Sequence, residues 1–315
     1  METNDTEPSS LFYVMMSDRR SSAPYFVISL ISVTIGNFLL HTVRKFVNEN
    51  QYAVLTDRLE SLLLLTVMVF NVYASFSWTL LWIIDNPSPI ICAIFTITMR
   101  QIYILVVIIC LQATIIRVLY MTVWKNIGAI NDDFFMLFFK ITSTTFSFLY
   151  GLNLAFFKTY QKYPNYWLCH RKRDSSFIPS VQADLGQILI GLTWLLGHIS
   201  VFILIRERKK LHKLHMESRL ASGLPRIGET HQGVHEFISF LLAYVAGSVF
   251  LSMHFLFRGF FISGDIDKFP YSLSYVIGQW VVGLHASFVH PLVKMWKNKR
   301  FYNFFIRQLQ GLTDF

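Results

Sequence analysis

Charged residues are scarce in this chain of 315 residues: Asp, Glu, Lys and Arg make up only 15% of it, whereas 53% is hydrophobic. A soluble domain carries about 25% charged residues, so the shortage excludes a surface that faces water on all sides. A lipid bilayer is the solvent that tolerates such a composition. The net charge of +9 does not indicate nucleic-acid binding, because Lys and Arg cluster in short segments between apolar runs.

Cysteine is rare as well, and no cleavable secretion signal is visible. The three cysteines, Cys92, Cys110 and Cys169, are too few for a disulfide scaffold but enough for one bridge and one free thiol. Residues 1–23 are polar and lack the apolar run of a signal peptide. We therefore expect the first apolar helix to insert the chain into the membrane.

Seven long apolar segments make up most of the remaining sequence, and each exceeds the roughly 18 residues that mark a membrane-spanning candidate. They cover residues 24–46, 59–84, 91–120, 132–157, 181–205, 234–259 and 271–294. This pattern predicts an all-α fold, a seven-transmembrane helix bundle over residues 24–296. An extracellular N-terminus over residues 1–23 would precede the bundle, and a cytoplasmic amphipathic helix and tail over residues 297–315 would follow it.

The distribution of basic residues predicts the orientation of this bundle. Lys and Arg are most numerous in the loops and tail that are cytoplasmic when the N-terminus is outside, although the outer loop 158–180 is also basic. Asn4-Asp5-Thr6 is a glycosylation sequon, which agrees with an outside N-terminus. We expect a multi-pass protein of the plasma membrane, with a glycosylated extracellular N-terminus and a cytoplasmic C-terminus.

Short motifs follow one another along the helices in a family-like order. They are Gly36-Asn37 in the first helix, Cys92 and Arg117 at the two ends of the third, Cys169 between the fourth and fifth, His290-Pro291 in the seventh, and Asn298-Lys299-Arg300-Phe301 after it. The set resembles the rhodopsin-like (class A) G-protein-coupled receptors over about residues 24–309. Because the sequence departs from the common motifs of the family at many positions, it resembles a divergent branch, the nematode serpentine chemosensory receptors. Divergent peptide receptors are the alternative.

The resemblance has two direct implications. It implies a disulfide bond between Cys92 and Cys169. It also implies that Arg117 contacts the G protein, although Ile116 and Val118 replace the acidic and aromatic neighbours that the family has. The alternative for Arg117 is an arginine that snorkels to the membrane border. Because the acid that restrains this arginine in relatives is missing, we expect high basal activity.

The seventh helix keeps the proline of the family and changes its neighbours. His290 and Pro291 replace Asn-Pro, and we expect an activation kink there. Lys294 replaces the family's tyrosine and is interpreted as the first of the cytoplasmic cations. In the second helix, Leu65 stands where the family's spacing would place a sodium-binding Asp.

The C-terminal stretch 297–309 combines cations with aromatic residues. Phe301, Phe304, Phe305 and Leu309 fall on one helical face, and basic residues crowd its start. This pattern is typical of an amphipathic helix on an anionic leaflet, and it is similar to the short eighth helix of the family. The alternative is an ordinary solvated tail.

Polar side chains in the outer half of the bundle are candidates for a ligand site. They are Arg100, Asp184, His254, Arg258, Gln279 and Trp280. The two arginines would favour an acidic group on the ligand, such as a carboxylate. The alternative is internal pairing of Arg100 with Asp184 and snorkelling of Arg258.

Basic residues at the cytoplasmic side are candidate contacts with a heterotrimeric G protein. They are Arg117, Arg208, Lys209, Lys210 and Lys297. The cluster at 206–210 also acts as a topology determinant.

Other classes of membrane protein fit the sequence less well. An insect-type chemoreceptor channel would place its N-terminus inside, against the charge distribution. A membrane desaturase would need a third histidine cluster beside His212-x-x-His215 and His231-x-x-x-His235, which we interpret as solvated loop histidines. A transporter would carry repeated halves and intramembrane acids, which we do not find.

We therefore expect a receptor that senses an extracellular chemosensory molecule or peptide and activates a heterotrimeric G protein within membrane lipids. We expect no enzymatic activity, no cofactor, no metal and no nucleic-acid partner. The alternative is a seven-helix ligand-gated channel or transporter-like protein without G-protein coupling.

Overall fold

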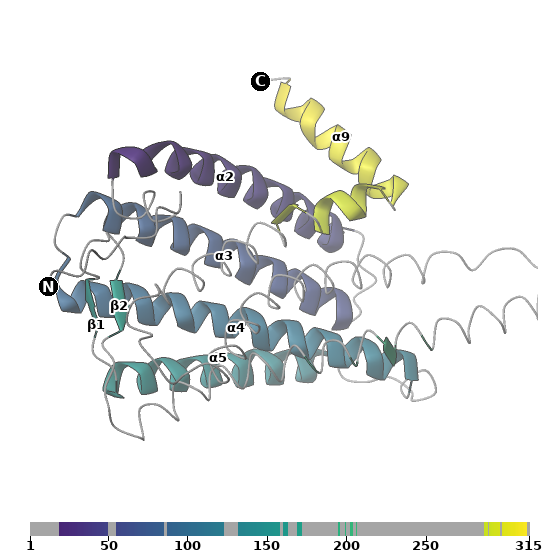
Figure 1. Ribbon diagram of the computed structural model, residues 1–315. Helices are drawn as coiled ribbons and strands as arrows, with labels where there is room; N and C mark the ends of the chain where they lie inside the picture. The colour runs from purple at the N-terminus through teal and green to yellow at the C-terminus, as the bar shows by residue number, and fades with distance from the viewer. Residues whose placement is uncertain are drawn as a thin grey trace, which may run out of the picture.

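In the computed structural model of the chain, four long helices lie side by side, and a shorter C-terminal helix contacts the first of them (Figure 1). The helices are α2 (Arg19–Glu49), α3 (Leu55–Ile83), α4 (Pro89–Thr122), α5 (Asp132–Phe157) and α9 (Lys299–Thr313). The structure describes residues 19–49, 55–84, 87–122, 132–157, 160–162, 169–171, 195, 199, 202–203, 206, 287–288, 290–296 and 298–313.

The first four predicted apolar segments are confirmed as helices, and no helix end differs from the predicted one by more than five residues. By length and composition, α3, α4 and α5 can each cross a membrane. Helix α4 has 34 residues and is therefore about 51 Å long, longer than a hydrocarbon core of about 30 Å. One end of α4 must therefore extend past the membrane. Most of the predicted segments 181–205 and 271–294, and all of 234–259, lie outside the described residues.

Local sequence explains where α4 begins. The Ser88 hydroxyl accepts a hydrogen bond from the amide of Ile91, at 3.3 Å, and Pro89 occupies the first helical position. Serine satisfies amides that have no partner in the first helical turn, and proline has no amide to satisfy there. This cap places Cys92 in the first turn of α4, where it is fully buried.

Helix α3 lies at the centre of the described bundle and contacts α2, α4 and α5. Its buried apolar side chains recur every three or four residues, which places them on one helical face. They are Leu59, Leu63, Val67, Phe70, Ala74, Trp78 and Leu81. The same buried cluster includes Leu40 and Val43 of α2 and Tyr103 and Val107 of α4.

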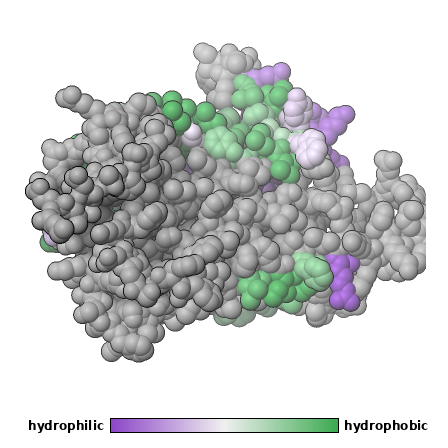
Figure 2. Space-filling view, in the orientation of Figure 1, coloured by the Kyte–Doolittle hydropathy of each residue, from purple (hydrophilic) through white to green (hydrophobic). Residues whose placement is uncertain are grey.

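The outer faces of these helices carry exposed apolar side chains, which suit lipid rather than water. They include Val27, Ile31, Val69, Val72, Phe76, Phe138, Ile141 and Phe148. Figure 2 shows hydrophobic side chains along the outside of the bundle and hydrophilic ones gathered toward one end. This distribution agrees with a helical protein embedded in a membrane.

A short hairpin follows α5. Strands β1 (Tyr160–Lys162) and β2 (Cys169–Arg171) pair antiparallel, with Lys162 opposite Cys169, and both contact α4. The described chain is otherwise helical. The hairpin brings the backbone of Cys169 against the helix that carries Cys92.

Helix α9 confirms the predicted amphipathic helix. The side-chain oxygen of Asn298 accepts a hydrogen bond from the amide of Phe301, at 3.0 Å, and so caps the start of α9. Phe301 is fully buried, with its ring centroid 5.1 Å from that of Phe46 on α2. Lys45 Nζ donates to Gln308 Oε1 at 3.1 Å. These contacts hold α9 against the last turn of α2.

Candidate functional site

A seam of buried polar side chains joins α2, α3 and the helical residues 287–288 and 290–296. At one point of this seam, the Asn71 amide nitrogen donates to Asn37 Oδ1 at 3.1 Å and to Ser287 Oγ at 2.8 Å. Asn71 and Ser287 are buried at 5% and 1% exposure. One asparagine of α3 therefore bonds to segments that lie 34 residues before it and 216 residues after it.

A glycine makes the closest approach in this region possible. A Cβ atom built on Gly36 would lie 2.8 Å from the Cβ of Ser287, closer than real side chains pack. The Gly36-Asn37 motif thus combines a small residue that admits residue 287 with an amide that bonds to Asn71. The sequence identified this motif by its resemblance to the receptor family, and the structure gives it a packing role.

The second part of the seam is ionic. Lys294 Nζ lies 3.1 Å from Glu60 Oε1, and His290 Nε2 lies 3.5 Å from the same oxygen. The side chains of Glu60, Lys294 and His290 are 8%, 7% and 1% exposed. A buried charge is costly unless an opposite charge and hydrogen bonds compensate it, so these three groups must stay together.

The ionic part of the seam also reaches α9. Lys294 Nζ lies 6.0 Å from the centroid of the Phe46 ring, within the range of a cation–π contact. Phe46 in turn packs against Phe301 and Phe304 of α9. A shift of residues 290–296 would therefore disturb both the Lys294–Glu60 pair and the aromatic contacts that hold α9 against α2.

The structure adds to one interpretation from the sequence and corrects another. Lys294, interpreted as the first of the cytoplasmic cations, is buried and lies against Glu60. Leu65 does not take the position of the family's sodium-binding Asp: its side chain is 36% exposed, and Asn71 is the polar side chain of α3 that bonds to Ser287.

Helix geometry gives the reason. Glu60 and Asn71 are eleven residues apart, which is three helical turns, so both side chains project from one face of α3. Leu65 is five residues from Glu60 and projects from another face. An acid and an amide at this spacing were the signal in the sequence for the missed residues.

Some of the other predicted site residues are described. Arg100 is half-buried on α4, and Pro291 is buried beside His290. For Arg117, near the end of α4, and for Cys169 in β2, the structure describes the backbone and not the side chain. Those wholly outside are Asn4, Asp184, His254, Arg258, Gln279, Trp280, Arg208, Lys209, Lys210 and Lys297. Within the described part of the chain, no three His, Cys, Asp or Glu residues gather as metal ligands would.

No protein-family model matches the chain, and no curated protein matches it in sequence. In structure the chain is similar to squid rhodopsin: the likeness to that crystal structure has a TM-score of 0.60 at 12% sequence identity, and covers 95% of this chain and 80% of the rhodopsin chain. At this identity the likeness establishes the fold. The chain has the seven-transmembrane helix bundle fold of rhodopsin, as predicted, and is a multi-pass membrane protein.

Proposed function

We propose that the chain is a receptor that detects an extracellular ligand and activates a heterotrimeric G protein. The observation that carries the proposal is the likeness in fold to squid rhodopsin over 95% of the chain. The buried seam adds support, because polar contacts between distant segments can exist in two arrangements whose balance a ligand shifts.

We propose that the end of the bundle where α2 ends and α3 and α5 begin faces the cytoplasm. Basic residues gather at this end, including Lys45 on α2, Arg58 on α3, Lys140 on α5 and Arg300 on α9. Positive residues favour the cytoplasmic side of membrane proteins. In this orientation Asn4 is extracellular and available for glycosylation.

We propose that the G protein binds at the same end. Arg117 lies five residues before the end of α4, which ends on this side. Arg208, Lys209, Lys210 and Lys297 would add positive charge around it. The altered neighbours of Arg117 leave the arginine without the adjacent acid of the family, which supports a high basal activity.

We propose that the ligand enters from the opposite end. Arg100 is two helical turns from Cys92 and half-buried, so its guanidinium can meet an acidic ligand group within the bundle. Asp184, His254, Arg258, Gln279 and Trp280 would complete this site. That the ligand is a chemosensory small molecule or a peptide is proposed from the sequence resemblance alone.

We also propose a disulfide bond between Cys92 and Cys169 that fixes the hairpin over this end. Three observations support it: Cys92 is buried, β2 begins at Cys169 and contacts α4, and Cys110 is the free cysteine among the described residues. Loss of the bond in Cys92→Ser should reduce surface expression, and Cys110→Ser should not.

The test is a screen of surface-expressed receptor with small carboxylates and peptides, read out by dissociation of the G-protein subunits. We expect a ligand-dependent signal that Arg117→Ala abolishes at unchanged surface expression. Arg100→Gln should weaken potency for acidic ligands and leave basal signalling intact. A ligand-gated current without G-protein dissociation, and insensitive to Arg117→Ala, would support the channel alternative instead.

A further inference from the structure

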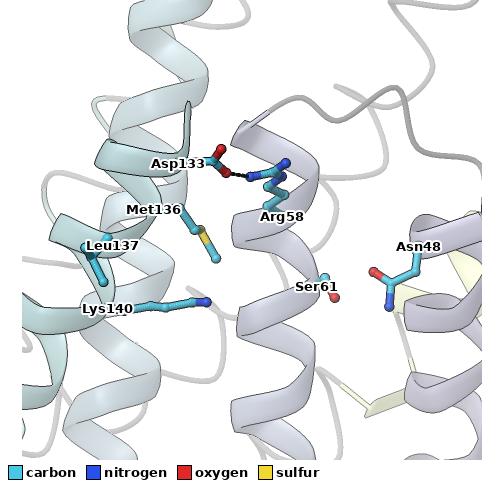
Figure 3. Close-up of a pocket in the computed structure, with 7 residues that line it drawn as sticks. All are labelled: Asn48, Arg58, Ser61, Asp133, Met136, Leu137 and Lys140. Carbon is cyan, nitrogen blue, oxygen red and sulfur yellow. Dashed lines mark hydrogen bonds and ion pairs between the residues drawn. The ribbon is translucent and has the colours of Figure 1, made fainter. Parts of the chain in front are cut away.

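A cavity of about 290 Å³ opens between the end of α2 and the starts of α3 and α5 (Figure 3). Its polar lining comes from all three helices: Asn48 of α2, Arg58 and Ser61 of α3, and Asp133 and Lys140 of α5. The Lys140 side chain extends from α5 toward α3, and Arg58 meets Asp133 at the mouth (Figure 3). The cavity lies outside the polar seam described above.

The charges of this cavity are unbalanced. Arg58 forms an ion pair with Asp133, which is 85% exposed. Among the described residues, no carboxylate forms an ion pair with Lys140. The lining therefore carries two cations and one carboxylate, and the Ser61 hydroxyl adds a hydrogen-bond donor. An anion fits this lining better than a neutral or cationic group.

The position of Lys140 indicates what kind of anion. Lys140 is eight residues into α5, about 12 Å from the start of the helix, and lies within the stretch Asp133–Phe156 that can cross a membrane. Its exposed neighbours Leu137, Phe138 and Ile141 are apolar. A lysine among lipid-facing side chains is costly unless its amino group reaches the interface or an anion.

We propose that this cavity binds the headgroup of an anionic phospholipid. The phosphate lies between Lys140 and Arg58 and receives a further hydrogen bond from Ser61. The acyl chains run along the apolar surface formed by Leu137, Phe138 and Ile141. Such a lipid joins α2, α3 and α5 at their common end, which stabilises the bundle when the lipid is bound.

The proposal rests on the membrane-embedded fold and not on G-protein coupling, so it can fail or succeed separately from the proposed function. The test uses the full chain in a neutral detergent, titrated with phosphatidylserine, phosphatidylcholine or inorganic phosphate. The readout is the midpoint of thermal unfolding. We expect phosphatidylserine to raise the midpoint, and phosphatidylcholine and inorganic phosphate to leave it unchanged.

Three variants locate the effect. Lys140→Gln should lower the apparent affinity for phosphatidylserine about fivefold, since each Lys or Arg contributes on this scale at an anionic lipid surface. Lys140→Arg should restore it, which separates loss of charge from misfolding. The matched control is Lys299→Gln on α9, an exposed cation outside the cavity, which should retain the full response.

Three outcomes would overturn the proposal. One is an equal response to phosphatidylcholine, and another is an equal response to inorganic phosphate, which would indicate a site for the free anion. The third is a response lost in Lys299→Gln and retained in Lys140→Gln, which would place lipid binding on α9.

Discussion

Lys294 and Glu60 are 234 residues apart in sequence, yet their charged atoms lie 3.1 Å apart inside the bundle. Lys294 stands at the position of a tyrosine in the receptor family that the sequence resembles. In this chain a buried ion pair therefore takes the position of a neutral aromatic side chain, and His290 adds a second contact to the same carboxylate oxygen. This pair fixes residues 290–296 against the start of α3.

Removal of one partner of this pair should destabilise the protein strongly. We expect Glu60→Gln or Lys294→Gln to cost about 3–5 kcal/mol, because each leaves a buried charge without its opposite. The double variant Glu60→Gln/Lys294→Gln should cost less than either single variant. Thermal unfolding of the purified variants measures this coupling, with Lys299→Gln as an exposed control; additive losses in the double variant would exclude a coupled pair.

The same variants should change signalling if the pair restrains the seventh helix. We expect the double variant to show higher basal G-protein activation than the wild type at equal surface expression. Because the double variant should lose less stability than either single variant, a change in its signalling is easier to separate from partial unfolding. Basal activation at or below the wild-type level would mean that the pair supports the fold without restraining the switch.

Asn71 is the second point at which distant segments depend on one side chain. Asn71→Leu removes both hydrogen bonds and takes their donor away from Asn37 Oδ1 and from Ser287 Oγ inside the bundle, a cost of about 1–3 kcal/mol. The matched control is Thr79→Ala on the same helix, because the Thr79 hydroxyl donates to the Ser75 carbonyl of its own helix and, among the described residues, to no other helix. A loss in Thr79→Ala as large as that in Asn71→Leu would refute a special role for Asn71.

Two glycines make a controlled test of the packing at residue 287. Gly36→Val places a side chain against Ser287 and should cost about 1–3 kcal/mol through overpacking. Gly311→Ala meets nothing within 4 Å and removes a glycine from α9, so it should be neutral or slightly stabilising. Equal unfolding midpoints for the two variants would show that residues 36 and 287 are not in close contact.

The docking of α9 on α2 should depend more on its buried aromatic contacts than on its exposed face. Phe301→Ala empties a fully buried site against Phe46, whereas Tyr302→Ala changes a side chain that is 50% exposed. We expect Phe301→Ala to lower the unfolding midpoint by several degrees and Tyr302→Ala to leave it within about one degree. Similar midpoints in the two variants would argue that α9 is not docked on α2.

Part of this architecture could be predicted from the sequence because it is encoded locally. Apolar runs of sufficient length predict α2 to α5, and the cations followed by Phe301 and Phe304 predict α9. The contacts within the seam could not be predicted in this way. Glu60 looks like an ordinary charge at the start of a helix until Lys294 is placed beside it, and no periodicity relates two residues so far apart.

The error at Leu65 has a related origin. The expectation came from the motif spacing of a receptor family, and Asn71 lies six residues beyond the position which that spacing indicates. The helical phase shared by Glu60 and Asn71 was the more reliable guide, because it follows from backbone geometry alone. The predicted ligand residues from 184 to 280 remain predictions.

The most direct test of the receptor account is guanine-nucleotide exchange on purified heterotrimeric G proteins, measured with the full chain in lipid nanodiscs. The account predicts faster exchange than with empty nanodiscs even without ligand, because no acid adjoins Arg117. Arg117→Ala should abolish this acceleration while the unfolding midpoint stays unchanged. Exchange no faster than with empty nanodiscs for every Gα subunit tested, or acceleration that survives Arg117→Ala, would contradict the account.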